Sequence, residues 1–291
     1  MTARYINPYT DFGFKKLFGE EANKDLLVDF LNQLLPDLHK IVNLTFKNTE
    51  RPGSLKEDRR AIFDIHCENE KGDKFIVEMQ KAKIKFFKDR SLFYTTFPIK
   101  EQAEKGDWNF RLKPIYCVAI LDFTFDDDRM QKTYLSNVKL KDQYCQTFYD
   151  KLTYIFIEMP RFTKGEDELV NHFDKWLYFL KNLESFQNIP EILKEEVFVK
   201  GFEVAEIANF DEIQLAEYEE SLKVYRDLKG VVDTSFEEGE KMGMEKGIIK
   251  GKIEGEKSKS LEIAKNLKKS GVDFKIIVKS TGLSIEEIEK L

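Results

Sequence analysis

Asp64, Glu78 and Gln80 are the residues whose types and spacing suit metal-assisted chemistry. Two carboxylates held close together repel each other unless a cation lies between them, and hard oxygen ligands favour Mg²⁺ or Mn²⁺. A divalent ion bound there lowers the pKa of a bound water and offsets the charge of a phosphoryl transition state. The three side chains therefore predict a metal site for phosphoryl chemistry, provided that the fold brings them together.

A β-hairpin is the element expected to do so. Apolar and polar side chains alternate over residues 60–67 and again over residues 74–80, with a Glu-Lys-Gly-Asp turn between the two segments. A loop of three or five residues centred on Lys71 sets Asp64 opposite Glu78, with Cβ atoms ~5 Å apart. Gln80 then projects from the same face as Glu78. The alternative interpretation is that these polar side chains are only the solvated face of the hairpin.

Basic residues follow the second strand, namely Lys81, Lys83, Lys85, Lys88 and Arg90. The whole chain has a formal net charge of −6, but residues 71–100 contain eight basic and three acidic side chains. Residues 184–240, in contrast, contain sixteen acidic and five basic side chains. The basic stretch is expected either to contact a DNA phosphate backbone or to form a solvated helix face.

The remaining pattern predicts an α/β core. Three- and four-residue apolar spacing predicts a helix over residues 11–35, and residues 41–46 are expected to form a short strand before a turn at 51–54. Further predictions are a helix over residues 83–105 with its weak point at Pro98, strands at 115–123 and 153–159, and helices from residue 166 onward. We expect a mixed central sheet flanked by helices and followed by an α-helical C-terminal region.

Composition limits the class of protein. Hydrophobic residues make up 42% of the 291 residues, enough for a substantial core. The three cysteines are far apart in the sequence, which argues against a disulfide framework or a thiolate zinc site. The N-terminus lacks a signal-peptide pattern, and no apolar run approaches the ~20 residues of a membrane-spanning helix. We expect a cytoplasmic protein without membrane contact.

The last part of the chain has a different pattern. Glycines recur every four residues from Gly239 to Gly255 in a stretch rich in Lys and Glu. They indicate either a linker or marginal helix, or a contact between copies of the chain, so the C-terminal helices are candidates for homo-oligomer formation. Short helices are predicted at 258–269, 272–279 and 285–291, the last capped by Ser284, which gives a small helix-turn-helix-like end. The expected domains are a core (1–160), a helical extension (161–235) and a tail (236–291).

Several of these motifs together resemble a known family. Phe-Asp64-Ile, the hairpin and Val-Glu78-Met-Gln80 resemble the PD-(D/E)xK nuclease motif, and the chain is similar to the Rpn family of recombination-promoting nucleases, also described as transposases. The similar segments, which span nearly the whole chain, are residues 7–19, 64–80, 116–123, 157–162, 176–181 and the glycine-spaced tail.

The resemblance implies a restriction-endonuclease-like core and Mg²⁺-dependent DNA cleavage that leaves a 5′-phosphate. It implies that Asp64 and Glu78 are metal ligands and that Gln80 stands where the wider superfamily has lysine. A neutral amide lacks the positive charge of lysine, so cleavage is expected to be weak, with Lys81 or Lys83 as candidate substitutes. Asp11 and Lys15 belong to the N-terminal signature of the family, and no role is assigned to them.

The leading hypothesis is a Mg²⁺- or Mn²⁺-dependent DNA endonuclease linked to recombination or transposition, with Asp64, Glu78 and Gln80 in the catalytic centre. The alternative is a catalytically silent DNA-binding or assembly protein on a nuclease fold, motivated by Gln80 and by the negative net charge. A third hypothesis is that the acidic segment at residues 184–240 regulates a partner nuclease.

Overall fold

A computed structural model of the chain describes residues 3–36, 39–48, 50–51, 61–103, 109–125 and 133–291. Contacts between residues divide the chain into two compact units, Met1–Lys229 and Gly230–Leu291. The boundary falls within the helix α6 (Glu212–Lys269), so the first part of this helix belongs to the first unit and the rest to the second.

The first unit is built on a six-stranded mixed sheet with the order β1-β4-β5-β6-β8-β7. Its strands are β1 (Leu44–Phe46), β4 (Ile65–Asn69), β5 (Lys74–Gln80), β6 (Ile115–Leu121), β7 (Leu135–Lys141) and β8 (Thr147–Glu158). The central strands β5, β6 and β8 are parallel, and the outer pairs β1–β4, β4–β5 and β7–β8 are antiparallel. A separate pair is formed by β2 (Glu50–Arg51) and β3 (Ala61–Ile62).

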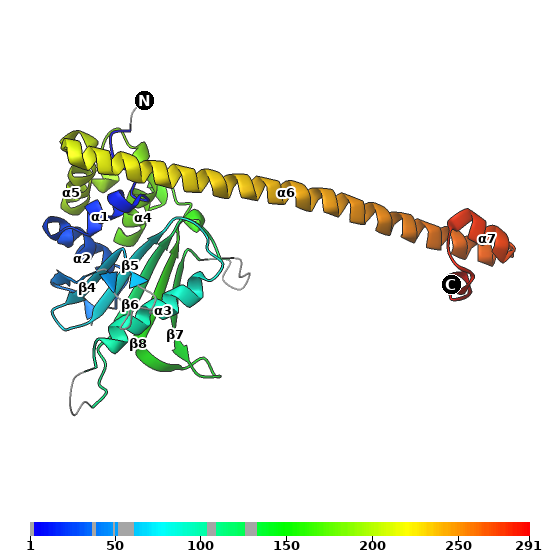
Figure 1. Cartoon of the computed structure of the whole chain (residues 1–291), viewed down its shortest axis with the longest axis horizontal. Coiled ribbons are helices and arrows are strands. Elements are labelled where there is room, and N and C mark those ends of the chain that lie inside the picture. Colours follow the sequence, from blue (N-terminus) through cyan, green and yellow to red (C-terminus); the bar gives the residue numbers. More distant parts are fainter. Residues whose placement is uncertain (1–2, 37–38, 49, 52–60, 104–108, 126–132) are drawn as a thin grey trace. The chain divides into compact units, whose positions relative to one another are not determined.

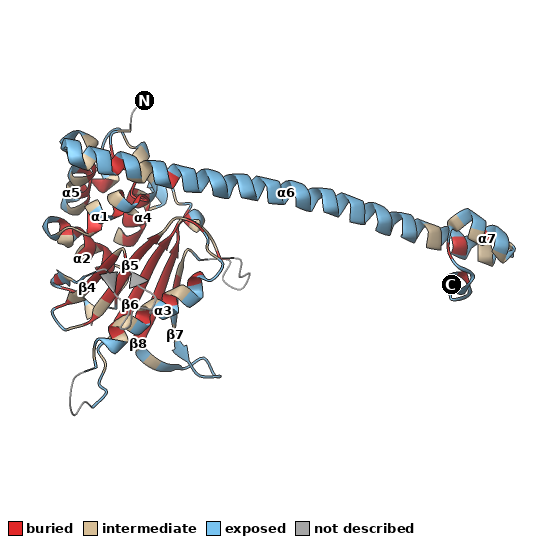
Figure 2. Cartoon of the chain, in the orientation of Figure 1, coloured by how far each residue is buried: buried red, intermediate tan, exposed pale blue. Residues whose placement is uncertain are grey.

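Helices cover both faces of this sheet (Figure 1). One face packs on α1 (Asp11–Phe18), α2 (Lys24–Asn32), α4 (His172–Asn182) and α5 (Glu196–Ala205), and the other on α3 (Phe87–Lys100). Alternation along β5 divides the side chains between the layers, because Phe75, Val77 and Met79 join the larger apolar cluster and Ile76 joins the cluster under α3. Figure 2 shows the buried residues concentrated in the central strands and the helices on them. The predicted α/β fold class is confirmed.

The predicted hairpin and its register are confirmed. Ile65 pairs with Val77 and Cys67 with Phe75, so the pairing is centred on Lys71. A three-residue loop closes it, with the Asn69 N–H bonded to the Asp73 carbonyl at 3.0 Å. Gly72 has φ of +84°, a backbone conformation that other residues rarely adopt, and it turns the chain here.

Other predicted elements need correction. The strand predicted at residues 60–67 is interrupted at Phe63 and Asp64, between β3 and β4; Arg60 and most of the predicted turn at 51–54 lie outside the described residues. The single helix predicted at 11–35 is two helices, because Gly19 ends α1 and the Asn23 side chain donates to the Lys16 carbonyl at 3.0 Å. Strand β7 lies in a segment for which sequence analysis predicts no element, and β8 begins earlier than predicted.

The second unit contains the rest of α6, α7 (Phe274–Thr281) and α8 (Ile285–Glu289). The spaced glycines are helical, and a Cβ placed on any of them meets no described atom within 4 Å apart from the adjacent backbone of the same helix. Ala264, Ile277, Leu283 and Ile288 form a small buried cluster between the end of α6 and the two short helices. Ser284 and Glu287 form the predicted capping box of α8. Among the described helices, none has both the length and the apolar character needed to cross a membrane.

Candidate active site

Asp64 lies one residue before β4, at the point where pairing with β5 stops. In a continued hairpin the Phe63 carbonyl would accept the N–H of Met79, because hydrogen-bonded pairs alternate along an antiparallel ladder. Asp64 Oδ2 accepts this N–H instead, at 2.7 Å. The break in the strand therefore leaves the Asp64 side chain anchored to the backbone of the partner strand.

The carboxyl group of Glu78 lies next to this anchor. Its Oε1 accepts the backbone N–H of Asp64 at 3.3 Å, and its Oε2 lies 3.4 Å from Arg90 Nη2. Glu78 is only 4% exposed. Burial and the charge of Asp64 raise the pKa of Glu78 to about 8, against the opposing charge of Arg90. Burial also raises the pKa of Asp64, against the Met79 N–H bond.

Gln80 ends β5 on the same face as Glu78. Its Nε2 donates to the Ala82 carbonyl at 2.9 Å, and its Oε1 accepts from Arg90 Nη2 at 2.7 Å. The position at which the superfamily pattern has lysine is thus occupied by an amide bonded to an arginine of α3. Arg90, which the basic pattern predicts only as a candidate DNA contact, lies against both Glu78 and Gln80.

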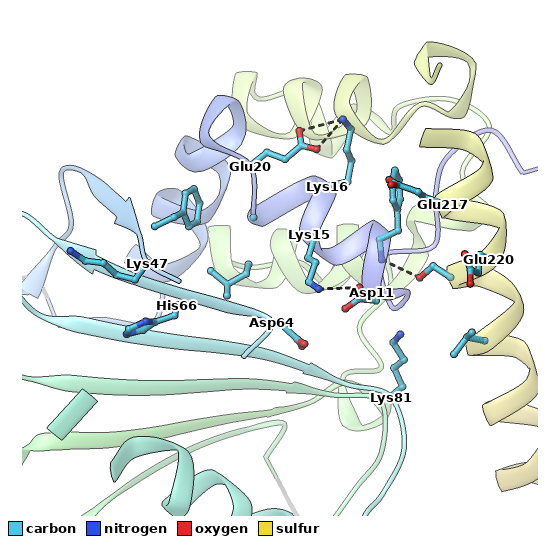
Figure 3. A pocket seen from close by; sticks show the side chains of 16 residues that line it. Asp11, Lys15, Lys16, Glu20, Lys47, Asp64, His66, Lys81, Glu217 and Glu220 are labelled. Atoms are coloured by element: carbon cyan, nitrogen blue, oxygen red, sulfur yellow. Dashed lines mark hydrogen bonds and ion pairs between the residues drawn. The ribbon is translucent and has the colours of Figure 1, made fainter. Parts of the chain in front are cut away.

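A cavity of about 760 Å³ lies against Asp64, between the hairpin, α1 and the first part of α6. Figure 3 shows Asp64 facing Asp11 and Lys15 of α1, with Lys81 entering from the segment after β5. Asp11 Oδ2 and Lys15 Nζ form an ion pair at 3.0 Å. Asp11 and Lys15, which sequence analysis singles out without a role, are therefore neighbours of Asp64.

The cavity wall carries charges of both signs. Its lysines are Lys15, Lys16, Lys47 and Lys81, and its acidic side chains are Asp11, Glu20, Asp64, Glu217 and Glu220. Burial lowers the pKa of Lys81, and the charges of Asp11 and Asp64 oppose this shift. Lys81 is thus the member of the predicted basic stretch that reaches the cavity beside Asp64.

The other basic residues of that stretch lie away from the cavity. Lys83, Lys85 and Lys88 are exposed. The ammonium group of Lys85 lies 5.4 Å from the ring centre of Phe86, and that of Lys88 lies 4.7 Å from the ring centre of Phe125. These side chains are accessible to a polyanion, and they are not among the residues that line the cavity.

Sequence analysis did not predict that α6 helps to form the site. Glu217, Glu220 and Ser221 line the cavity although they are more than 150 residues away from Asp64 in the sequence. Ser221 Oγ accepts the Phe12 N–H at 3.1 Å, and the Tyr218 hydroxyl accepts the Asn7 N–H at 2.9 Å. The segment falls in the region predicted to be helical, but no local signal identifies its partner.

The donor set at Asp64 and Glu78 fits a hard divalent ion that keeps part of its water shell. Within the described residues, no three His, Cys, Asp or Glu side chains are grouped to hold a metal. Mg²⁺ is commonly bound by one or two carboxylates together with water and substrate phosphate. Burial and the charge of Asp64 raise the pKa of Glu78 although the Arg90 guanidinium lies beside it. The site suits Mg²⁺ or Mn²⁺ better than a closed structural zinc site.

A mixed sheet flanked by helices, with Asp64 and Glu78 in contact beside its parallel strands, defines a restriction-endonuclease-like α/β protein. A family model described as PD-(D/E)XK nuclease family transposase matches residues 8–235, and the chain belongs to this family. No curated protein and no solved structure shows a significant match to the chain. Membership indicates a nuclease or transposase-related function.

Proposed function

We propose that the protein is a divalent-metal-dependent DNA endonuclease in which Asp64 and Glu78 hold Mg²⁺ or Mn²⁺. The observation that carries the proposal is the contact between these residues: Glu78 Oε1 lies 3.3 Å from the Asp64 backbone nitrogen, and Asp64 lies at the wall of a cavity that contains lysines. A bound divalent ion would supply a water of lowered pKa and offset charge on the phosphoryl group.

The residues of the chain have separate tasks in this proposal. The Met79 N–H holds the Asp64 carboxylate in place, so that little ordering remains to be done when a metal ion binds. Lys81, beside Asp64, attracts the DNA phosphate into the cavity. Lys83, Lys85 and Lys88, all exposed, hold the neighbouring backbone through salt-dependent contacts.

The test is cleavage of supercoiled plasmid by pure wild-type protein with Mg²⁺, with Mn²⁺ and with EDTA. Nicking that requires the metal and stops in EDTA supports the proposal. Equal nicking in EDTA contradicts metal dependence, and no nicking in any condition contradicts endonuclease activity. A parallel gel shift in EDTA measures DNA binding in the absence of cleavage.

A catalytically silent DNA-binding or assembly protein is the second candidate. It is favoured by the neutral amide of Gln80 and by the five acidic side chains around the cavity. This candidate predicts DNA binding with a steep salt dependence and no metal-dependent nicking. A DNA shift without nicking therefore selects it over the endonuclease.

A further inference from the structure

We propose that Arg90 belongs to the reaction centre: it supplies, from α3, the positive charge that Gln80 lacks, and Gln80 serves as its acceptor. The inference rests on the proposed endonuclease activity and adds a residue to it. It also changes the role of Arg90, which the sequence pattern groups with the DNA-backbone contacts.

Gln80 is oriented to receive a cation. An amide side chain has a donor end and an acceptor end. The donor end, Nε2, is bonded to the Ala82 carbonyl at 2.9 Å, which leaves Oε1 as the end that faces Arg90 at 2.7 Å. The main chain after β5 thus fixes the amide in the orientation that binds a guanidinium group.

Glu78 divides its two oxygens between different partners. Oε1 accepts the backbone N–H of Asp64, and Oε2 accepts from Arg90 Nη2. Asp64 and Glu78 would hold the metal ion, and the guanidinium lies against the Glu78 oxygen that does not contact Asp64. The carboxylate can therefore interact with both cations at once, as it would with a metal and a lysine at position 80.

Aromatic rings restrict the guanidinium group of Arg90. Its central carbon lies 5.2 Å from the ring centre of Tyr94 and 5.6 Å from that of Phe87. The Arg90 side chain is nevertheless 33% exposed, compared with 5% for that of Glu78. Within the described part of the chain, both hydrogen bonds of Arg90 use Nη2, so Nε and Nη1 remain as donors for a phosphoryl oxygen.

Cleavage rates test the role of this charge. We expect Arg90→Ala to lower the cleavage rate at saturating protein by about tenfold or more. We expect Gln80→Lys in the Arg90→Ala background to recover most of that loss, because it returns a cation to the same carboxylate. Lys100→Ala, which removes an exposed cation from the same helix, is the matched control and leaves the rate unchanged. A normal rate for Arg90→Ala, or no recovery in the double variant while both proteins remain folded by circular dichroism, overturns the inference.

The salt dependence of DNA binding separates this role from a backbone contact. A lost phosphate contact lowers the slope of log affinity against log salt by about one. We expect Arg90→Ala to lower the cleavage rate of bound DNA, whether or not this slope falls. A fall in the slope, accompanied by a normal cleavage rate for bound DNA, would make Arg90 an ordinary DNA contact.

A titration with Mn²⁺ gives a result that does not depend on cleavage. Removal of a cation next to Glu78 is expected to tighten Mn²⁺ binding several-fold in Arg90→Ala and to leave Lys100→Ala unchanged. Equal Mn²⁺ affinity in wild type and Arg90→Ala overturns the inference even if the protein cleaves DNA. Tightened binding without cleavage in wild type would instead support the placement of Arg90 and contradict the endonuclease proposal.

Discussion

At the scale of the residue, the protonation of Glu78 links the candidate site to the stability of the protein. Its carboxyl group has a pKa of about 8 in the folded chain, above the ordinary value of 4.5. Between these two values the folded chain retains a proton that the unfolded chain has released. Rising pH therefore favours the unfolded chain over this range.

We expect the free energy of unfolding of the metal-free protein to fall between about pH 5 and pH 8 because of this group. The contribution is on the order of a few kcal/mol, since each pKa unit corresponds to about 1.4 kcal/mol. Urea denaturation in EDTA across this range measures it, and Glu78→Gln should remove this part of the fall.

Glu68→Gln on the neighbouring strand is the matched control. Burial acts to raise the pKa of Glu68, but the bonds and charges of Lys74 and Lys47 outweigh burial and lower the pKa. The ionised Glu68 carboxylate stabilises the folded chain, and this effect is lost as the pH falls. We therefore expect Glu68→Gln to keep the decrease in the free energy of unfolding above pH 5. If the free energy of unfolding falls equally steeply with pH in wild type and in Glu78→Gln, Glu78 is not the group that retains the proton.

At the scale of the element, the packing of α5 on α4 depends on one small residue. A Cβ added to Gly201 would lie 2.9 Å from Cζ of the buried Phe179 ring. Gly247 of α6 offers the opposite case, because an added Cβ meets no described atom within 4 Å. The same substitution at these two helical positions should therefore have opposite effects.

We expect Gly201→Ala to lower the free energy of unfolding of the first unit by about 1–3 kcal/mol through overpacking. Gly247→Ala should increase helix stability by up to about 1 kcal/mol, because alanine is the better helix former. Chemical denaturation followed by far-ultraviolet circular dichroism measures both. A higher free energy of unfolding for Gly201→Ala would mean that the Phe179 ring moves without cost.

The elements that sequence reasoning predicts best are those with local signals. The hairpin has alternating side chains on both strands and a glycine at the left-handed position of its turn. These local signals place the turn, and the length of the loop then sets the register of the two strands. The break before β4 has no such signal. It depends on Asp64 replacing a main-chain acceptor, which no propensity of the surrounding residues indicates.

The parts of the candidate site that the sequence did not predict come from other elements. Arg90 reaches Glu78 and Gln80 because α3 packs on the second face of the sheet, and Ser221 reaches the cavity because α6 packs on α1. Both contacts depend on how helices dock, which periodicity does not specify. The sequence therefore predicted that Asp64 and Glu78 lie close together, and it missed the cation next to Glu78.

At the scale of the whole molecule, the two compact units have separate cores. The two larger apolar clusters contain no residue beyond Tyr225, and the small cluster at the C-terminus contains none before Leu261. The family match, which ends at residue 235, coincides approximately with this division. The first unit therefore contains both the core and the described candidate site.

We expect a chain ending at Lys229 to unfold cooperatively, with a melting temperature within a few degrees of that of the first unit in the full protein. A chain ending at Asp211 is the control. It lacks the Tyr218 and Tyr225 hydroxyls, which bond to the Asn7 N–H and to Asp122 respectively, and should be clearly less stable. A chain ending at Lys229 that does not fold would show that the first unit requires residues 230–291.

The most direct test of the central claim compares wild type with Asp64→Asn in the nicking of supercoiled plasmid in Mn²⁺. Asparagine keeps an oxygen that accepts the Met79 N–H and removes the negative charge, so that the fold is retained while the metal site loses a ligand. We expect a loss of about 100-fold or more in rate, since a metal ion contributes several kcal/mol to transition-state stabilisation. Equal nicking by the two proteins would contradict it.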